Sequence, residues 1–177
     1  MIMKKSLALL AVVLLVAAVA TPGFAQMKKA PAQRGKAELG TPGGSITIDY
    51  GRPSLAGRDM LSQLKEGDFW RMGQNQATVF TTPVDLTFGK VTVPKGSYSL
   101  WLAKTGEKYD LVFNSQTGQW GTDHDPSKDV YKVSMAASNL PNPVETFTID
   151  LKAAAQGGAF EMSWGSTKLA ANLQFAK

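Results

Sequence analysis

The feature that most constrains the fold is an alternation of apolar and polar residues, with a period of two, that begins at Ser45. Ile46, Ile48 and Tyr50 alternate with polar residues, and the same pattern returns at 97–102 and 146–151. Successive side chains of a β-strand point to opposite faces, so this alternation predicts strands with one apolar face. Further strands are predicted at 77–82, 84–88, 90–93, 108–114, 130–135, 159–164 and 168–175, which makes about ten.

The predicted strands are joined by short segments with the residues typical of tight turns. These segments are Phe88-Gly89-Lys90, Pro94-Lys95-Gly96, 104–107, 156–158 and Trp164-Gly165-Ser166. Short turns favour antiparallel neighbours. Only 59–65 has helical potential, with Asp59 as its N-cap. We therefore expect a single all-β domain over 45–177: an antiparallel, jelly-roll-like β-sandwich or a partly closed barrel, with at most one short helix.

The first 25 residues predict a cleavable signal peptide. Lys4 and Lys5 precede fourteen apolar residues from Leu7 to Ala20, and small residues stand at the two positions before a cut that signal peptidase reads. A retained anchor is the alternative, but this run is shorter than the roughly 20 residues that cross a membrane. We expect cleavage after Ala25, a periplasmic or secreted protein, and no transmembrane segment after cleavage.

Residues 26–44 are rich in Lys, Ala, Gly and Pro and show no apolar period, which predicts a flexible basic tether. A membrane-surface arm is the alternative interpretation. The formal net charge of +5 arises in this segment and in the leader, because residues 45–177 hold 13 basic and 13 acidic residues. A neutral domain lacks the basic surface that nucleic acids require, so no nucleic-acid partner is expected.

The chain has no cysteine, which excludes disulfides, a thiol nucleophile and thiolate metal sites. Two fragments typical of penicillin-recognising enzymes occur, Ser62-x-x-Lys65 and Lys104-Thr105-Gly106, but the third element of that set is missing. The nucleophile elbow, the zinc-protease motif, the phosphate-binding loop and the dinucleotide fingerprint are absent as well. The sequence therefore predicts no catalytic residue and no cofactor.

The single histidine stands within the segment Asp123-His124-Asp125-Pro126-Ser127-Lys128-Asp129. Carboxylates beside an imidazole can ligate a divalent metal, so His124, Asp123 and Asp125 are candidate metal ligands. We favour a surface turn instead, because Asp125 before Pro126 suits the N-cap and first position of a single helical turn. A contribution to a ligand site is the third interpretation.

Residues 69–78 combine two aromatics, an arginine and three amides directly before a predicted strand. Upstream, Arg52 shares the parity of Tyr50 and is expected to point toward the core, where it needs a carboxylate partner or an anionic ligand. Trp120 is a candidate platform for a sugar or a peptide. The candidate ligand-binding residues are therefore Arg52, Arg58, Trp70, Arg71, Asn75, Gln76 and Trp120.

Four segments, taken in order and at their spacing, resemble the exported bacterial family catalogued as domain of unknown function 2911. They are 49–58 (DYGRPSLAGR), 70–78 (WRMGQNQAT), 96–100 (GSYSL) and 118–121 (GQWG). The resemblance covers about residues 45–175 and implies an exported single β domain without established activity. The family pattern has a glutamate where this chain has Gln76, and an amide cannot act as a general base.

Three classes of function are compatible with these observations. The first is non-enzymatic binding of a small molecule, glycan or envelope protein at the end of the sandwich where the arginines and amides converge. The second is a hydrolase or lyase acting on a cell-envelope carbohydrate or peptide, with Asp49, Asp123 or Asp125 as acid or base. The third is a purely structural envelope protein. We favour the first, because enzymes usually show two titratable groups with distinguishable roles.

Overall fold

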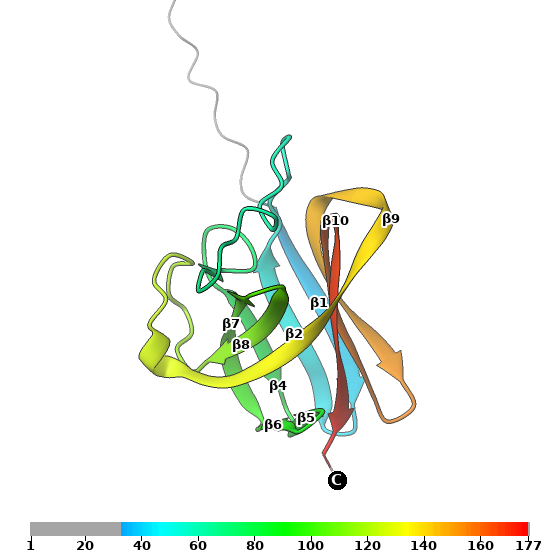
Figure 1. Cartoon of the computed structure of the whole chain (residues 1–177). Helices are drawn as coiled ribbons and strands as arrows, with labels where there is room; N and C mark the ends of the chain where they lie inside the picture. The colour runs from blue at the N-terminus through cyan, green and yellow to red at the C-terminus, as the bar shows by residue number, and fades with distance from the viewer. Residues whose placement is uncertain (1–32, 177) are drawn as a thin grey trace, which may run out of the picture. The chain divides into compact units, whose positions relative to one another are not determined.

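The structure is a computed structural model that describes residues 33–176, and these residues form an all-β domain (Figure 1). Ten strands form one antiparallel sheet, and its two end strands, β1 and β6, are not paired with each other, so the sheet is not closed into a barrel. The prediction of an all-β antiparallel fold is confirmed. In the described part of the chain no helix is long and apolar enough to cross a membrane. The predicted signal peptide lies outside these residues.

The strand order along the sheet is β1-β2-β4-β7-β8-β9-β10-β5-β6, and β3 pairs with β7 beside this path. Their bounds are β1 Arg34–Thr41, β2 Gly44–Gly51, β3 Phe69–Trp70, β4 Thr78–Thr82, β5 Leu86–Phe88, β6 Val91–Val93, β7 Gly96–Thr105, β8 Lys108–Asn114, β9 Asp129–Ala154 and β10 Gly157–Phe175. The one helical segment found in 33–176 is the 3-10 turn Pro126–Lys128.

The long strand β9 connects the two halves of the sheet. Its first residues, from Asp129 to Met135, pair with β8, and the remainder, from Ala136 to Ala154, pairs with β10. Figure 1 shows the strand crossing the molecule from the yellow part beside β8 to the orange part beside β10. Both end strands of the sheet, β1 and β6, contact β9. The sheet therefore folds back on this strand and encloses one core.

The core is built from the apolar faces that the period-two pattern predicts. Ile46, Ile48 and Tyr50 of β2 are buried in it, and so are the large aromatics Phe80, Phe113, Phe147 and Phe160. The rings of Phe80 and Phe113 meet edge to face, with centroids 5.4 Å apart. Because strands from both halves contribute to this one cluster, burial of apolar surface holds the folded sheet together.

The prediction of a flexible tether over 26–44 is wrong for Arg34–Thr41, which form β1 and pair with β2 along their whole length. Ala37 and Leu39 are buried, and the charged residues between and beside them face outward. The alternation is present but weak, because its buried positions hold glycine and alanine as well as leucine. Residues 26–32 lie outside the described residues.

Two of the long strands each merge two predicted ones. The segments 130–135 and 146–151 are both parts of β9, and 159–164 and 168–175 are both parts of β10. Trp164-Gly165-Ser166 is not a turn: the register shifts on either side of Gly165 show a bulge within β10. The segment 59–65 forms turns rather than a helix, although Asp59 does accept a hydrogen bond from the Ser62 N–H at 3.2 Å.

A seam between β2 and the second half of β9 is bridged by side chains. The buried hydroxyl of Tyr50 donates to the carbonyl of Ile149 at 3.1 Å and accepts from its N–H at 3.0 Å. Arg52, two residues further, donates from Nε to the carbonyl of Phe147 at 3.3 Å. Both side chains pass over Gly35 of β1, where a Cβ atom would lie 2.6 Å from Arg52 Cδ and 2.8 Å from Tyr50 Cζ. Only glycine leaves room for them.

Replacement of Tyr50 by phenylalanine tests this seam. Tyr50→Phe leaves the buried N–H and C=O of Ile149 without the hydroxyl, and we expect a loss of about 1–3 kcal/mol in the free energy of unfolding, measured by urea denaturation. Tyr98→Phe is the matched control, because its hydroxyl donates only to the carbonyl of Pro94. An equal or larger loss for Tyr98→Phe would contradict the special role of Tyr50.

The close approach over β1 gives a second prediction. Gly35→Ala forces the Tyr50 and Arg52 side chains aside, and we expect it to cost about 1–3 kcal/mol, as overpacking does. Gly40→Ala in the same strand meets no atom within 4 Å and should change stability by less than about 0.5 kcal/mol. Equal urea midpoints for the two variants would show that β1 does not lie under these side chains.

Candidate functional site

The hollow that collects most of the chemically interesting side chains lies between β3, β7 and the loop 119–124. We call it the aromatic pocket; its volume is about 380 Å³. Its apolar lining consists of Met60, Phe69, Trp70 and Trp101. Its polar lining consists of Arg71, Thr122 and His124, with Gly121 between the two loops. Among residues 33–176 no carboxylate lines this pocket.

Pairing of β3 with β7 places two aromatics on opposite faces of the sheet. Phe69 pairs with Ala103 and Trp70 with Leu102. The ring of Trp70 turns inward and stacks on Trp164 at 5.1 Å. The ring of Phe69 turns to the outer face and is 40% exposed. The outer face of β7 thus forms the floor of the pocket, and Phe69 forms part of its wall.

His124 is held in a fixed orientation between two rings. Its imidazole stacks on Trp101 and contacts Phe69, with both centroid distances 4.4 Å. Its Nε2 lies 2.9 Å from Oδ1 of Asp129, and the same oxygen accepts from Nδ2 of Asn114 at 2.8 Å. A carboxylate oxygen can only accept, so Nε2 carries the hydrogen. Nδ1 forms no hydrogen bond with any residue of 33–176.

The loop that carries His124 is anchored from both ends. Asp125 is the N-cap of the 3-10 turn and Pro126 follows it, so the predicted capped surface turn is confirmed. Hydrogen bonds from the hydroxyl and N–H of Ser127 lower the pKa of the Asp125 carboxyl. The fully buried Asn114 donates to the carbonyl of Asp125 at 2.8 Å. The loop therefore has a defined conformation and covers the outer face of β7 and β8.

The three candidate metal ligands, His124, Asp123 and Asp125, do not converge in the described part of the chain. His124 pairs with Asp129 rather than with Asp123 or Asp125, and the Asp125 carboxylate is used as a cap. The Asp123 carboxylate is exposed and accepts from the hydroxyl of Thr122. Within the described residues no three histidine or carboxylate side chains lie close enough to share a metal ion.

Arg71 brings a positive charge into the pocket without a carboxylate partner in the described part of the chain. Its Nε donates to the carbonyl of Gly73 at 3.3 Å, which orients the guanidinium. Its aliphatic part packs over Gly121, where a Cβ atom would lie 2.6 Å from Arg71 Cδ. The two terminal nitrogens of the guanidinium are left for a ligand, and this pair is the fork that binds carboxylates and phosphates with two hydrogen bonds.

The structure brings four of the predicted site residues to one place. The carbonyl of Asn75 accepts from the N–H of Gly121 at 2.7 Å, and Gln76 forms an isolated bridge with Trp120. These contacts join the 71–76 loop to the 119–121 loop and bring Arg71, Asn75, Gln76 and Trp120 together. Of these four, only Arg71 is among the described residues that line the aromatic pocket; Trp70, a fifth predicted residue, lines it from its inner side.

Two predicted residues lie elsewhere. Arg52 binds the carbonyl of Phe147 and the hydroxyl of Thr148, so the carboxylate partner expected for it is absent from the described residues, and it does not line the pocket. Arg58 lines a smaller hollow of about 240 Å³ with Asp59 and Glu145. Asp49, the other carboxylate considered for acid or base chemistry, pairs with Arg34 on the surface. The predicted convergence of all the arginines is wrong.

Sequence reasoning missed four residues of the site: Phe69, Trp101, Asn114 and Asp129. For Trp101 one sequence signal was available: it shares the parity of Ser97 and Ser99, on the polar face of its strand. In the structure it is nevertheless buried, with 2% of its surface exposed. A tryptophan on a polar face requires a cover, and residues 115–128 provide it. The pairing of His124 with Asp129 depends on the path of the loop, which has no local sequence signal.

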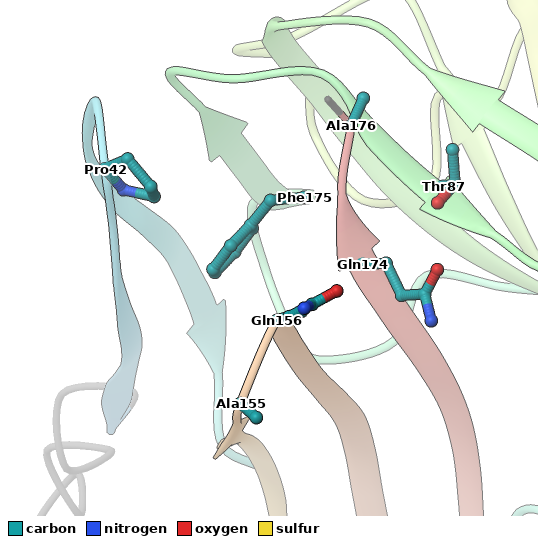
Figure 2. Close-up of a pocket in the computed structure, with 7 residues that line it drawn as sticks. All are labelled: Pro42, Thr87, Ala155, Gln156, Gln174, Phe175 and Ala176. Carbon is teal, nitrogen blue, oxygen red and sulfur yellow. The ribbon is translucent and has the colours of Figure 1, made fainter.

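A larger hollow of about 560 Å³ lies beside the β1–β2 and β9–β10 turns (Figure 2). Figure 2 shows the ring of Phe175 directed toward Pro42 and the amide of Gln156 directed toward Gln174. Its described lining contains no charged or titratable side chain. Size alone does not make a functional site, and the aromatic pocket is the better candidate because it combines aromatics with a cation and an imidazole.

The chain was compared with known proteins. Residues 31–173 match the family described as protein of unknown function (DUF2911). No curated protein and no solved structure matches the chain. The family match covers most of the chain, including β1 to β9 and nearly all of β10. The chain therefore belongs to the DUF2911 family, whose function is unknown.

Proposed function

We propose that this chain is an exported, non-enzymatic binding domain that holds a small anionic ligand in the aromatic pocket. The observation that carries the proposal is the position of Arg71: it lines a hollow with aromatic walls and has no carboxylate among the residues around it. A cation in a partly desolvated hollow is stabilised by an anion, and a ligand can supply one.

The exposed aromatics support the same place. Among the described residues three large hydrophobic side chains are exposed: Phe69, Trp120 and Val130. Phe69 lines the pocket, and Trp120 precedes Gly121 of its lining and is 50% exposed. Exposed aromatics grouped around one hollow are typical of binding surfaces. They provide the apolar contact that an anion-binding group alone does not.

The alternative function, a hydrolase or lyase acting on an envelope carbohydrate or peptide, is favoured by one observation. His124, oriented by Asp129, lines the same pocket, and an oriented imidazole is the usual general base. Of the three carboxylates first considered for this chemistry, Asp49 and Asp125 are engaged with Arg34 and Ser127, and Asp123 accepts a hydrogen bond from Thr122. Release of product from a bound probe, followed by NMR over hours, would favour the enzyme over the binding domain.

Export is the first part of the proposal to test. The basic start, apolar run and small residues before Gln26 should direct the chain through the secretion machinery. Expression of the full chain in a Gram-negative host should yield periplasmic protein whose intact mass begins at Gln26. A chain that keeps Met1 and stays with the membrane fraction would contradict this.

Ligand binding is tested with small ring-bearing anions as probes: benzoate, cyclohexanecarboxylate, phenyl phosphate and D-glucuronate. We expect at least one of them to raise the melting temperature and to bind in titration calorimetry. Arg71→Gln should weaken that binding about tenfold or more, because it removes charge-assisted hydrogen bonds. Arg58→Gln changes an arginine that lines the hollow of about 240 Å³ instead, and it should leave the affinity for the anion unchanged. Equal affinity in the two variants, or no binding at all, would overturn the proposal.

A further inference from the structure

The hydrogen-bonding state of His124 restricts what a ligand in the aromatic pocket must bring. Asp129 Oδ1 fixes the hydrogen on Nε2, so the neutral imidazole presents a lone pair at Nδ1. The side chain is 11% exposed and lies between two aromatic rings of the pocket lining, and Nδ1 is not among the buried side-chain atoms without a partner, so solvent or a ligand can reach it. A carboxylate oxygen cannot donate to this lone pair. A ligand that offers a donor, such as a hydroxyl group, gains a hydrogen bond at this point.

Arg71 makes the opposite demand. Its terminal nitrogens donate and require an acceptor with negative charge. A ligand that binds both residues therefore needs two groups on one molecule: an anion at Arg71 and a hydroxyl at His124. A flat aromatic acid supplies the first and lacks the second, so it forgoes the hydrogen bond at Nδ1 that a hydroxyl-bearing acid can make.

The aromatic lining and the volume of the pocket indicate which kind of molecule carries the anion and the hydroxyl. Phe69 is 40% exposed at the pocket, whereas Trp101 is 2% exposed and covered by the imidazole. Phe69 therefore offers the aromatic surface that can pack against the C–H face of a pyranose ring. A volume of about 380 Å³ suits a ligand of one sugar unit. Trp120, exposed beside Gly121, offers a further apolar surface next to the pocket for a neighbouring unit.

We propose that the ligand of the aromatic pocket is an acidic sugar, bound by its carboxylate at Arg71 and by a ring hydroxyl that donates to Nδ1 of His124. This inference rests on the proposed function of the pocket and specifies its ligand class. Asp129 acts as a positioning residue, because it holds the imidazole in the form that accepts at Nδ1. No covalent step is involved.

The single histidine makes the hydrogen-bonding state directly measurable. In ¹⁵N-labelled protein, at a pH where the imidazole is neutral, we expect one imidazole signal set with the hydrogen on Nε2. Addition of D-glucuronate should shift the Nδ1 resonance in the direction of an accepted hydrogen bond. A hydrogen on Nδ1 in the free protein would overturn the inference without any variant being made.

Affinity is measured by titration calorimetry with three probes: D-glucuronate, D-glucose, which lacks the carboxylate, and cyclohexanecarboxylate, which lacks the hydroxyls. We expect D-glucuronate to bind about tenfold more tightly than either of the others. His124→Phe keeps a ring between Phe69 and Trp101 but removes the acceptor. It should weaken D-glucuronate about tenfold and leave cyclohexanecarboxylate unchanged.

The outcomes separate this inference from the proposed function. Cyclohexanecarboxylate that binds as tightly as D-glucuronate, and still depends on Arg71, would overturn the acidic sugar and retain an anion-binding pocket. Failure of every anion to bind the wild-type protein would overturn both. Asp129→Ala gives a further readout: because it removes the acceptor that holds the hydrogen on Nε2, it should lower the share of this form in the ¹⁵N spectrum and weaken D-glucuronate, whereas a merely structural role would change the melting temperature alone.

Discussion

The fold depends on how the second half of β9 is held against β1 and β2 without a complete ladder of backbone hydrogen bonds. The Tyr50 hydroxyl serves as both acceptor and donor for the backbone of Ile149, and Arg52 binds the next outward carbonyl, that of Phe147. Beyond them, the N–H of Phe147 donates to the carbonyl of Pro53 at 2.9 Å. Because unsatisfied buried backbone groups are costly, these contacts fix β2 relative to β9. Gly35 makes these contacts possible because it has no side chain in the space that Tyr50 and Arg52 occupy.

The same seam positions the candidate site. The carbonyl of Arg52 accepts from Nε2 of Gln74 at 3.1 Å, so the loop that follows β3 is seated on the end of β2. That loop turns sharply, with positive φ at Met72 and Asn75, and delivers Arg71 to the pocket on its other side. Arg52, which looked like a ligand-binding residue in the sequence, thus supports the loop that carries the real candidate. Arg52 and Arg71 have different roles because different residues surround them.

Sequence alternation predicted the strands whose apolar faces are made of large residues, such as Ile46, Ile48 and Tyr50. It failed for β1, where Gly35 and Ala37 take two of the inward positions, and a small inward residue gives almost no periodic signal. It also divided β10 at Gly165, since a glycine bulge resembles a turn when only local sequence is read. The site was predicted in part: the arginine and amide cluster is local, whereas the partnership of His124 with Asp129 and the cover over Trp101 arise only from the tertiary path of residues 115–128.

Met60 and Trp70 of the pocket lining pack against the main core, while the floor of the pocket lies on the outer face of the sheet. Trp101, Ala103 and Val112 form a second small apolar cluster there, apart from the large one. The loop that covers it carries its own supports, the Asp125 cap and the buried Asn114. Exposed positions of this loop, such as Thr122 and Asp123, can vary without disturbing the seam at Tyr50. Under the proposed function, Arg71 and His124 are the two residues whose opposite hydrogen-bonding demands select a ligand that carries both an anion and a donor.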